Sequence, residues 1–241
     1  MIQNNFENIP LAPEQCVTGF GTTLIVAPHA DDESLGCGGV ISLLRKFGQN
    51  VYILLLSDGT LSHPNSKEHP AERLRDLREK ELLDASEILG VPAENIIFCR
   101  YKDRNVPSIH HEGFENAVNS ISKMMGMIQP QSIFVPWRRD PHPDHQAAFQ
   151  LINASETSNA KIYEYPIWLK ELGKEGDKPA QDETMPFRLN ISSVLAQKQE
   201  AISQHRSQIN GMISDDPEGF QLSQEMLSQF NVPYETFFIS K

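Results

Sequence analysis

The chain has few of the features that assign a protein to an extracellular or membrane class. Its three cysteines are widely spaced and form no CxxC pair, which indicates a reducing compartment without a disulfide framework. No apolar run approaches the roughly 20 residues that a membrane-spanning helix needs. The first ten residues combine no basic segment with an apolar stretch, so we expect no secretory signal and a cytoplasmic protein.

Positive charge is also scarce. The 241 residues include 21 Lys and Arg against 32 Asp and Glu, a formal net charge of -11, and the basic residues form no block. This balance disfavours binding to nucleic acid phosphates or to anionic lipid. We therefore expect neither a nucleic acid partner nor a membrane span, and the sequence leaves a homo-oligomer open. The length and the 39% hydrophobic content suit one folded domain.

What the sequence does contain is a regular alternation of short apolar runs and longer amphipathic segments. The apolar runs predict strands at residues 22–27, 51–56, 95–99 and 132–135. The amphipathic segments predict helices at residues 34–47, 70–89, 113–128 and 142–154. This order predicts an α/β fold, a Rossmann-like three-layer sandwich with a mostly parallel sheet.

The pattern weakens after residue 168. We expect strands at 187–191 and 234–239, a helix at 192–208, and a surface loop or mobile flap at 170–185. Residues 1–20 are polar and are expected to drape over the domain. We treat 1–241 as a single domain, with a catalytic core at about 22–168 and a C-terminal extension of the same domain at 169–241.

Two polar motifs follow predicted strands. The first strand runs into PHADDESLGCGG, and the fourth is followed by PHPDH at 141–145. In open α/β sheets, ligands bind beyond the carboxyl ends of the strands. His29 and Asp32 can reach one ion across a tight turn, and His145 can supply a third ligand. Three such ligands leave one position of a catalytic zinc open for water. The same set also suits Fe²⁺ or another divalent ion.

Neighbouring side chains complete a hydrolytic site. Asp31 shares the turn with the proposed ligands and is placed to accept a proton from water. His142 can stabilise an oxyanion as an imidazolium or protonate a leaving nitrogen. Asp144 is the expected carboxylate that orients His142.

Four further residues are candidates for substrate binding. Ser62 and His63 lie on the polar loop after the second strand and can line the pocket. Trp137 and Arg138 precede the second motif and can stack on or bind a sugar. Plain surface packing is the alternative for Trp137 and Arg138.

Other polar or small residues have simpler explanations. Glu33 either benefits from the helix dipole or supports the site. Cys37 and the glycines around it are expected to let the helix pack closely on the sheet. His205 is expected to be structural, and the charged helix at 72–87 is expected to present a solvated face.

The two blocks PHADDESLGCGG and WRRDPHPDHQAA resemble the LmbE-like zinc deacetylases, the family of N-acetylglucosaminyl-phosphatidylinositol de-N-acetylase (PIG-L). Weaker likenesses are SDGTLSH, LREKELLDASEILG and KQEAISQHRSQ, so the resemblance extends over most of residues 22–210. It implies an LmbE-like fold and removal of an N-acetyl group from an amino sugar or glycoconjugate. The resemblance implies that zinc is bound by His29, Asp32 and His145. It also implies that Asp31 is the general base and that His142 gives electrostatic stabilisation. Ala30 departs from the family, which usually has Pro there.

Three classes of function are compared with these motifs. A metal-dependent N-deacetylase is the preferred one. A dinucleotide-binding domain would need glycine where Ile41 stands, and the acidic cluster would repel a pyrophosphate. A non-catalytic sugar- or metal-binding protein is disfavoured by the complete set of site residues, and an amidase acting on a different amide stays open.

Overall fold

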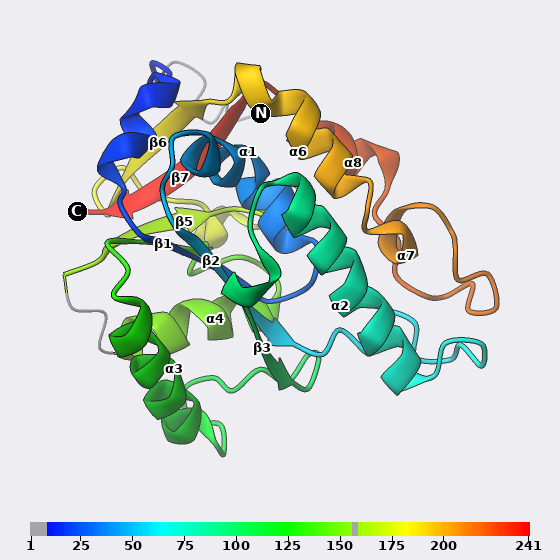
Figure 1. The fold of residues 1–241 in the computed structure, drawn as a ribbon. Coiled ribbons are helices and arrows are strands. Elements are labelled where there is room, and N and C mark those ends of the chain that lie inside the picture. The colour runs from blue at the N-terminus through cyan, green and yellow to red at the C-terminus, as the bar shows by residue number, and fades with distance from the viewer. Residues whose placement is uncertain (1–8, 156–158) are drawn as a thin grey trace.

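The computed structural model describes residues 9–155 and 159–241, so part of the expected N-terminal lead-in lies outside it. A seven-stranded sheet has the order β3-β2-β1-β4-β5-β7-β6 (Figure 1). Strands β1 to β5 are parallel, and β7 pairs antiparallel with both β5 and β6. The strands are β1 (Thr23–Ala27), β2 (Val51–Ser57), β3 (Ile96–Tyr101), β4 (Ser132–Pro136), β5 (Lys161–Tyr165), β6 (Thr184–Asn190) and β7 (Tyr234–Ser240).

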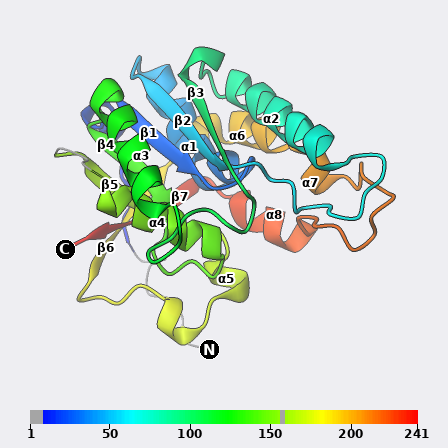
Figure 2. The ribbon, with the colours of Figure 1, turned by 90° about the horizontal axis from the view of Figure 1, so that it is seen from below.

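Helices cover both faces of this sheet (Figures 1 and 2). They are α1 (Asp32–Lys46), α2 (Ala71–Ile88), α3 (Phe114–Ile128), α4 (Pro143–Ala154), α5 (Leu169–Leu172), α6 (Leu195–Ile202), α7 (Arg206–Ile209) and α8 (Gln224–Phe230). The predicted three-layer α/β fold is thereby confirmed. Within the described ranges, none of these helices combines the length and apolar character needed to cross a bilayer.

Two hydrophobic cores explain why the central strands are apolar throughout. Alternate side chains of β1 point to opposite faces of the sheet. Ile25 belongs to the core under α1, α2, α6 and α8, whereas Leu24 and Val26 belong to the core under α3 and α4. The cores bury both faces of β1, which therefore has no polar side to alternate with.

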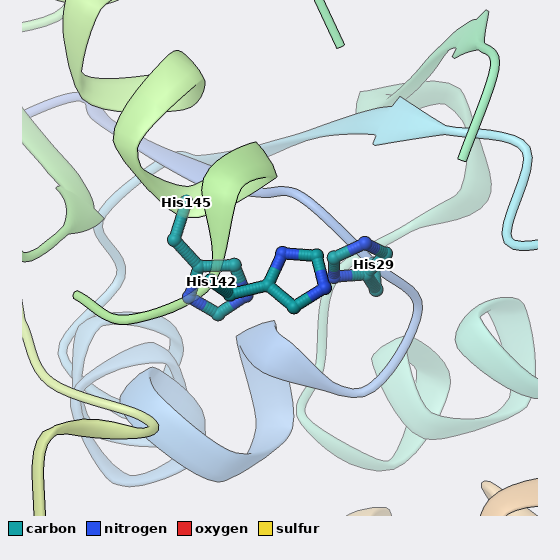
Figure 3. A group of neighbouring side chains, drawn as sticks. All are labelled: His29, His142 and His145. Carbon is teal, nitrogen blue, oxygen red and sulfur yellow. The ribbon is translucent and has the colours of Figure 1, made fainter. Parts of the chain in front are cut away.

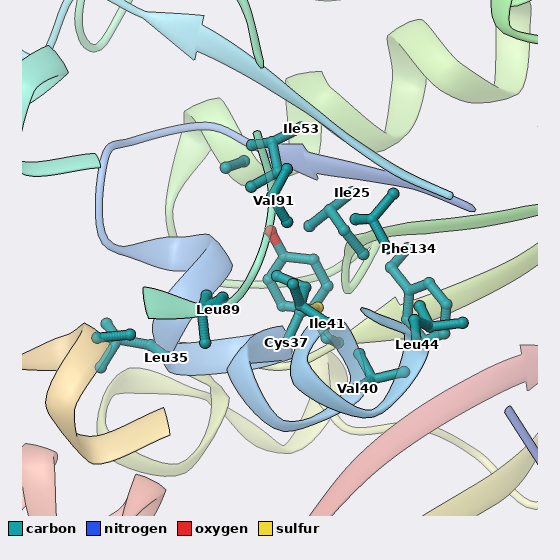
Figure 4. Packing of buried hydrophobic residues seen from close by; sticks show 14 of the residues in the cluster. Ile25, Leu35, Cys37, Val40, Ile41, Leu44, Ile53, Leu89, Val91 and Phe134 are labelled. Carbon is teal, nitrogen blue, oxygen red and sulfur yellow. The ribbon is translucent and has the colours of Figure 1, made fainter. Parts of the chain in front are cut away.

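Helix α1 packs tightly on the sheet because its first turns carry small residues. A Cβ added at Gly36 would lie 2.4 Å from the ring of Tyr165, so only glycine fits there. The Tyr165 hydroxyl in turn donates a 2.7 Å hydrogen bond to the carbonyl oxygen of Val26. Cys37 is fully buried in the same core (Figure 4), which agrees with a packing role.

The strand order places a crevice beside β1. The chain moves from β1 to β2 and β3 on one side, and then returns to β4 on the other side of β1. Connections that leave neighbouring parallel strands in opposite directions open a crevice at the carboxyl ends of those strands. The two polar motifs follow β1 and β4, and the strand order therefore brings them together.

The sequence-based elements match the structure well up to α4 and less well beyond it. The segment expected as a loop at 170–185 contains most of α5, a short 3-10 helix (Glu175–Asp177) and the start of β6. The helix expected at 192–208 is interrupted between α6 and α7. Helix α8 was not expected. It has seven residues with one buried side chain, Met226, which is too little apolar periodicity to reveal a helix.

Candidate active site

The loops after β1, β2, β3 and β4 converge on a cavity of about 270 Å³. Its polar side is formed by His29, Asp31, Asp32, Asp103 and His142. The opposite side is apolar and includes Leu35, Leu61, Ile167, Trp168, Phe220 and Leu222. A cavity with one charged and one apolar side suits a polar ligand that also has a hydrophobic face.

His29 lies between three carboxylates. Its Nδ1 is 3.3 Å from Oδ2 of Asp32, in the turn that leads into α1. Its Nε2 is 3.1 Å from Oδ2 of Asp144 and 3.4 Å from Oδ1 of Asp103. Each ring nitrogen thus has a different set of acidic neighbours.

His145 is fully buried in the first turn of α4 and approaches the same carboxylate. Its Nε2 is 3.2 Å from Oδ2 of Asp32, and its Nδ1 is 3.3 Å from Oδ1 of Asp140. Neither contact has the geometry of a hydrogen bond, so Nε2 is a buried polar atom without a hydrogen-bond partner in the described chain. A buried nitrogen in this situation is costly unless another group completes its environment.

These atoms fit a divalent metal ion. One oxygen of Asp32 lies close to both His29 Nδ1 and His145 Nε2, a nitrogen- and oxygen-donor set that zinc accepts. The other nitrogen of each ring faces a carboxylate, as is usual for histidines that bind a metal. His142 is near as well (Figure 3), since nitrogens of the three histidines lie within 4.8 Å of one another.

The charges of this cluster stabilise one another. Burial disfavours the imidazolium form of His145, yet the charges of Asp32 and Asp140 raise its pKa to about 9. Burial likewise disfavours an ionised Asp32, but the neighbouring His145 and His29 hold its pKa well below the usual range. Asp32 is therefore available as an ionised ligand at neutral pH.

Asp31 occupies a strained position at the cavity. Its φ of 142° is rare for any residue other than glycine, and such strain often marks functional sites. The Asp31 backbone N–H donates to Oε2 of Glu33 at 3.0 Å, and Oε1 of Glu33 lies 2.9 Å from Nε2 of His205. Glu33 thus supports the turn that carries Asp31. His205 is expected from the sequence to be structural, and in the structure it holds Glu33 in place.

Arg78 lies on the other side of Asp31. Its Nη2 is 3.6 Å from Oδ2 of Asp31 and donates to the carbonyl oxygen of Ala30 at 2.9 Å. Burial raises the pKa of Asp31, the charge of Arg78 opposes this, and the charge of Asp32 adds to it, giving a pKa of about 7. The expectation that helix 72–87 presents only a solvated face is wrong for Arg78, which is 4% exposed.

His142 caps the N-terminus of α4. Its Nδ1 accepts a 3.2 Å hydrogen bond from the backbone N–H of Asp144, so the proton of the neutral ring sits on Nε2. Burial lowers the pKa of His142 to about 4, and the nearby His29 and His145 act in the same direction. The ring is then a neutral hydrogen-bond donor rather than the imidazolium considered from the sequence.

The expected role of Asp144 is corrected in one respect. Its carboxylate faces His29 and accepts hydrogen bonds from the backbone N–H groups of Arg104 at 2.7 Å and Val106 at 3.2 Å. Only the backbone of Asp144 orients His142. The side chain points to the loop after β3, which the sequence pattern did not connect with α4.

Of the four candidate substrate contacts, Ser62 lines the cavity. His63 is buried behind it, with Nδ1 3.3 Å from the Ser62 hydroxyl. Trp137 is fully buried, and its Nε1 donates to the carbonyl oxygen of Asp177. Arg138 forms an ion pair with Glu164.

The prediction that Trp137 and Arg138 face a sugar is therefore wrong. The backbone N–H of Trp137 still bonds to the carbonyl oxygen of Tyr165, at 2.8 Å. Pairing with β5 thus continues beyond β4, and the side chains of these two residues pack beside the sheet instead of entering the cavity.

Several residues at the cavity were not identified from the sequence. Asp103 follows β3, so the rule that polar residues after strands form sites could have found it. Trp168 and Phe220 form an edge-to-face pair with centroids 5.7 Å apart. Phe220 is held by a hydrogen bond from its backbone N–H to the Ser62 carbonyl oxygen, a long-range contact without a local sequence signal.

Fold and site together define a class of α/β proteins with a cluster of potential metal ligands at the carboxyl ends of parallel strands. Residues 24–155, more than half of the chain, match the family described as PIG-L: GlcNAc-PI de-N-acetylase. The chain belongs to this family and is an N-deacetylase.

Two proteins named as deacetylases and one named as a hydratase are similar to the chain. It is 27% identical to the probable N-acetyl-alpha-D-glucosaminyl L-malate deacetylase 2 of Bacillus cereus over 80% of this chain and 86% of that protein. N,N'-diacetylchitobiose deacetylase from Pyrococcus horikoshii has a similar fold, with a TM-score of 0.63 and 21% identity over 95% of this chain and 77% of that one. The hydratase GalB of Pseudomonas putida also shares the fold, with a TM-score of 0.65 and 18% identity over 91% of this chain and 95% of that one.

Proposed function

We propose that the protein is a zinc-dependent hydrolase that removes the N-acetyl group from an amino sugar or glycoconjugate. The observation that carries this proposal is the position of Asp32 Oδ2 between His29 Nδ1 and His145 Nε2, with Asp31 at the same cavity. His29, Asp32 and His145 would hold the ion. When bound, zinc polarises the amide carbonyl and lowers the pKa of water.

The residues of the chain then have distinct tasks. A carboxylate oxygen of Asp31 accepts a proton from water as the water oxygen bonds to the carbonyl carbon of the acetamide. The electron pair of the C=O bond moves onto the carbonyl oxygen, and the Nε2–H of His142 donates a hydrogen bond to it. When the C–N bond breaks, the electron pair on the oxyanion re-forms the C=O bond, and Asp31 returns the proton to the leaving nitrogen. The products are acetic acid and an amine, which exchange a proton to give acetate and an ammonium group.

The pKa of Asp31 suits this task. A general base is most effective when its pKa lies near the working pH, and burial raises the pKa of Asp31 to about 7. The Arg78 guanidinium keeps a positive charge beside it, so the carboxylate still ionises in a buried position.

The apolar side of the cavity supports a sugar as the substrate. Sugar rings have C–H faces that pack on aromatic side chains, and Trp168 and Phe220 supply such surfaces. The names of the Bacillus cereus and Pyrococcus horikoshii proteins both refer to N-acetylated sugars. We therefore place an N-acetylglucosamine unit in this cavity.

The experiment that tests the proposal is acetate release by protein that is first made metal-free and then given zinc. Substrates are N-acetylglucosaminyl L-malate, N,N'-diacetylchitobiose and methyl N-acetylglucosaminide. Release that requires zinc supports the proposal. Equal release without metal, or no release from any substrate by the zinc-loaded protein, contradicts it.

A further inference from the structure

Two of the cavity-lining residues are permanently cationic, and their surroundings differ. Arg78 is buried, and its guanidinium is occupied by Asp31 and by the carbonyl oxygens of Ala30 and Gly59. Arg104 is exposed. Within residues 9–155 and 159–241, its guanidinium has no hydrogen-bond or ion-pair partner.

The backbone of Arg104 is tied to the proposed metal centre. Its N–H donates to Oδ2 of Asp144 at 2.7 Å, and the same oxygen lies 3.1 Å from Nε2 of His29. Its φ of 60° is in the left-handed region, which residues other than glycine seldom adopt. One carboxylate thus fixes both the ligand histidine and the point from which the Arg104 side chain leaves the loop.

The charge of Arg104 is unusual in its setting. The nearby Lys102 is paired with Asp58 and Thr60. The cavity also has carboxylates at Asp31, Asp32 and Asp103, in a chain with a net charge of -11. A neutral sugar needs no free cation here, whereas an anionic substrate needs one to offset repulsion by these carboxylates.

We infer that Arg104 binds an anionic substituent of the substrate, a carboxylate or a phosphate carried by the part of the glycoside outside the acetamide. This inference rests on the proposed function and specifies its substrate class. A guanidinium recognises both groups through paired N–H donors, and an exposed, uncommitted one can do so without losing an existing partner. Trp168 and Phe220 then contact the sugar, and Arg104 contacts its charged substituent.

The test compares kcat/KM for three compounds that share N-acetylglucosamine: the neutral methyl glycoside, the L-malate glycoside and the 1-phosphate. Each is measured with the zinc-loaded wild type and with Arg104→Gln, Arg104→Lys and Lys102→Gln. Gln and Lys at position 104 must adopt the same positive φ as Arg104, and Lys102→Gln does not alter position 104. Zinc content and the thermal midpoint show that each variant is folded and loaded.

We expect Arg104→Gln to lower the ratio of anionic to neutral kcat/KM by about tenfold or more, mainly through KM. Arg104→Lys should lower this ratio less than Arg104→Gln does. Lys102→Gln removes a nearby charge that is already paired, and it should leave the ratio at the wild-type value. A fall for the malate compound alone identifies a carboxylate, and a fall for the 1-phosphate alone identifies a phosphate.

The inference is wrong if Arg104→Gln leaves the ratio of anionic to neutral kcat/KM unchanged, or lowers it no more than Lys102→Gln does. The deacetylase function would still stand in that case. Failure of the wild type to release acetate from all three compounds overturns the proposed function, and the inference with it. The two failures are therefore distinguished by whether the wild type releases acetate from any of the three compounds.

Discussion

Asp144 and His29 are 115 residues apart in the chain, and their side chains meet at 3.1 Å between Oδ2 and Nε2. The contact connects the first turn of α4 with the loop after β1. It also fixes which nitrogen of His29 faces the cluster, because Nε2 is directed to Asp144 and Nδ1 to Asp32. Asp144 therefore acts on a proposed ligand, although the sequence suggested that it acts on His142.

Asp144→Asn should weaken zinc binding by about 10- to 100-fold, because a carboxylate that orients a ligating histidine commonly has an effect of this size. The measurement is a zinc dissociation constant by competition with a chelator. Asp182→Asn, at an exposed position, is the matched control. Equal affinities for the two variants would rule out the orienting role of Asp144.

His145→Ala should abolish stoichiometric zinc binding, because it removes one of three proposed protein ligands and the buried Nε2 that lacks another partner. Metal analysis of the purified variant tests this. His205→Ala is the control, since His205 is equally buried but contacts Glu33 instead of the cluster. Zinc at the wild-type level in His145→Ala would show that the ligand set is wrong.

His205→Ala should lower kcat by about tenfold or more and leave KM little changed. Glu33 would lose its partner, and the strained backbone of Asp31 would lose its fixed acceptor. His205→Gln, which keeps an N–H donor, should recover part of kcat. If KM rises and kcat is preserved, His205 does not position Asp31.

Gly36→Ala should destabilise the fold by about 1–3 kcal/mol, because its Cβ would lie 2.4 Å from Tyr165 in a filled core. The control is Gly126→Ala in α3, where no atom lies within 4 Å of an added Cβ and helix propensity favours alanine. Chemical denaturation of both variants measures the difference. A neutral Gly36→Ala would mean that α1 can move away from the sheet at little cost.

The loop that carries Ser62 should lose stability in acid. Hydrogen bonds from the backbone of Glu68 and the hydroxyl of Ser66 lower the pKa of Asp215 to about 2. A carboxyl whose pKa is lower in the folded state stabilises it above the unfolded pKa of about 4, and this contribution disappears as the pH falls toward 2.

Asp215→Asn should therefore lower the midpoint of unfolding at pH 7 and have little effect near pH 2. Thermal unfolding across this range, with Asp182→Asn as the control, measures the effect. A difference between wild type and Asp215→Asn that stays constant from pH 7 to pH 2 would contradict the assignment.

The fold was predictable from the sequence where hydrophobic periodicity is strong. Helices α1 to α4 show the helical period of apolar residues, and the central strands beside them are short runs that are apolar throughout. Helix α8 lacks this period of apolar residues, and His205, in the break between α6 and α7, contacts Glu33, which is 172 residues away in the chain. The C-terminal part was accordingly less predictable than residues 22–154.

The site was predictable to the extent that its residues are close in sequence. Two short motifs supplied His29, Asp31, Asp32, His142 and His145. Arg78 was missed because an arginine in a charged helix normally faces water, and only tertiary packing buries this one. Trp137 is predicted at the cavity because it precedes the second motif, but the side chain of Trp168 is the one that lines it.

The most direct test of the central claim is acetate release by Asp31→Asn, measured on a sample whose zinc content is determined at the same time. We expect full zinc occupancy and turnover reduced by at least about 100-fold, because the proton acceptor is lost and the ligands remain. Near-normal turnover at full zinc occupancy would show that Asp31 is not the base, and the proposed division between ligands and base would be wrong.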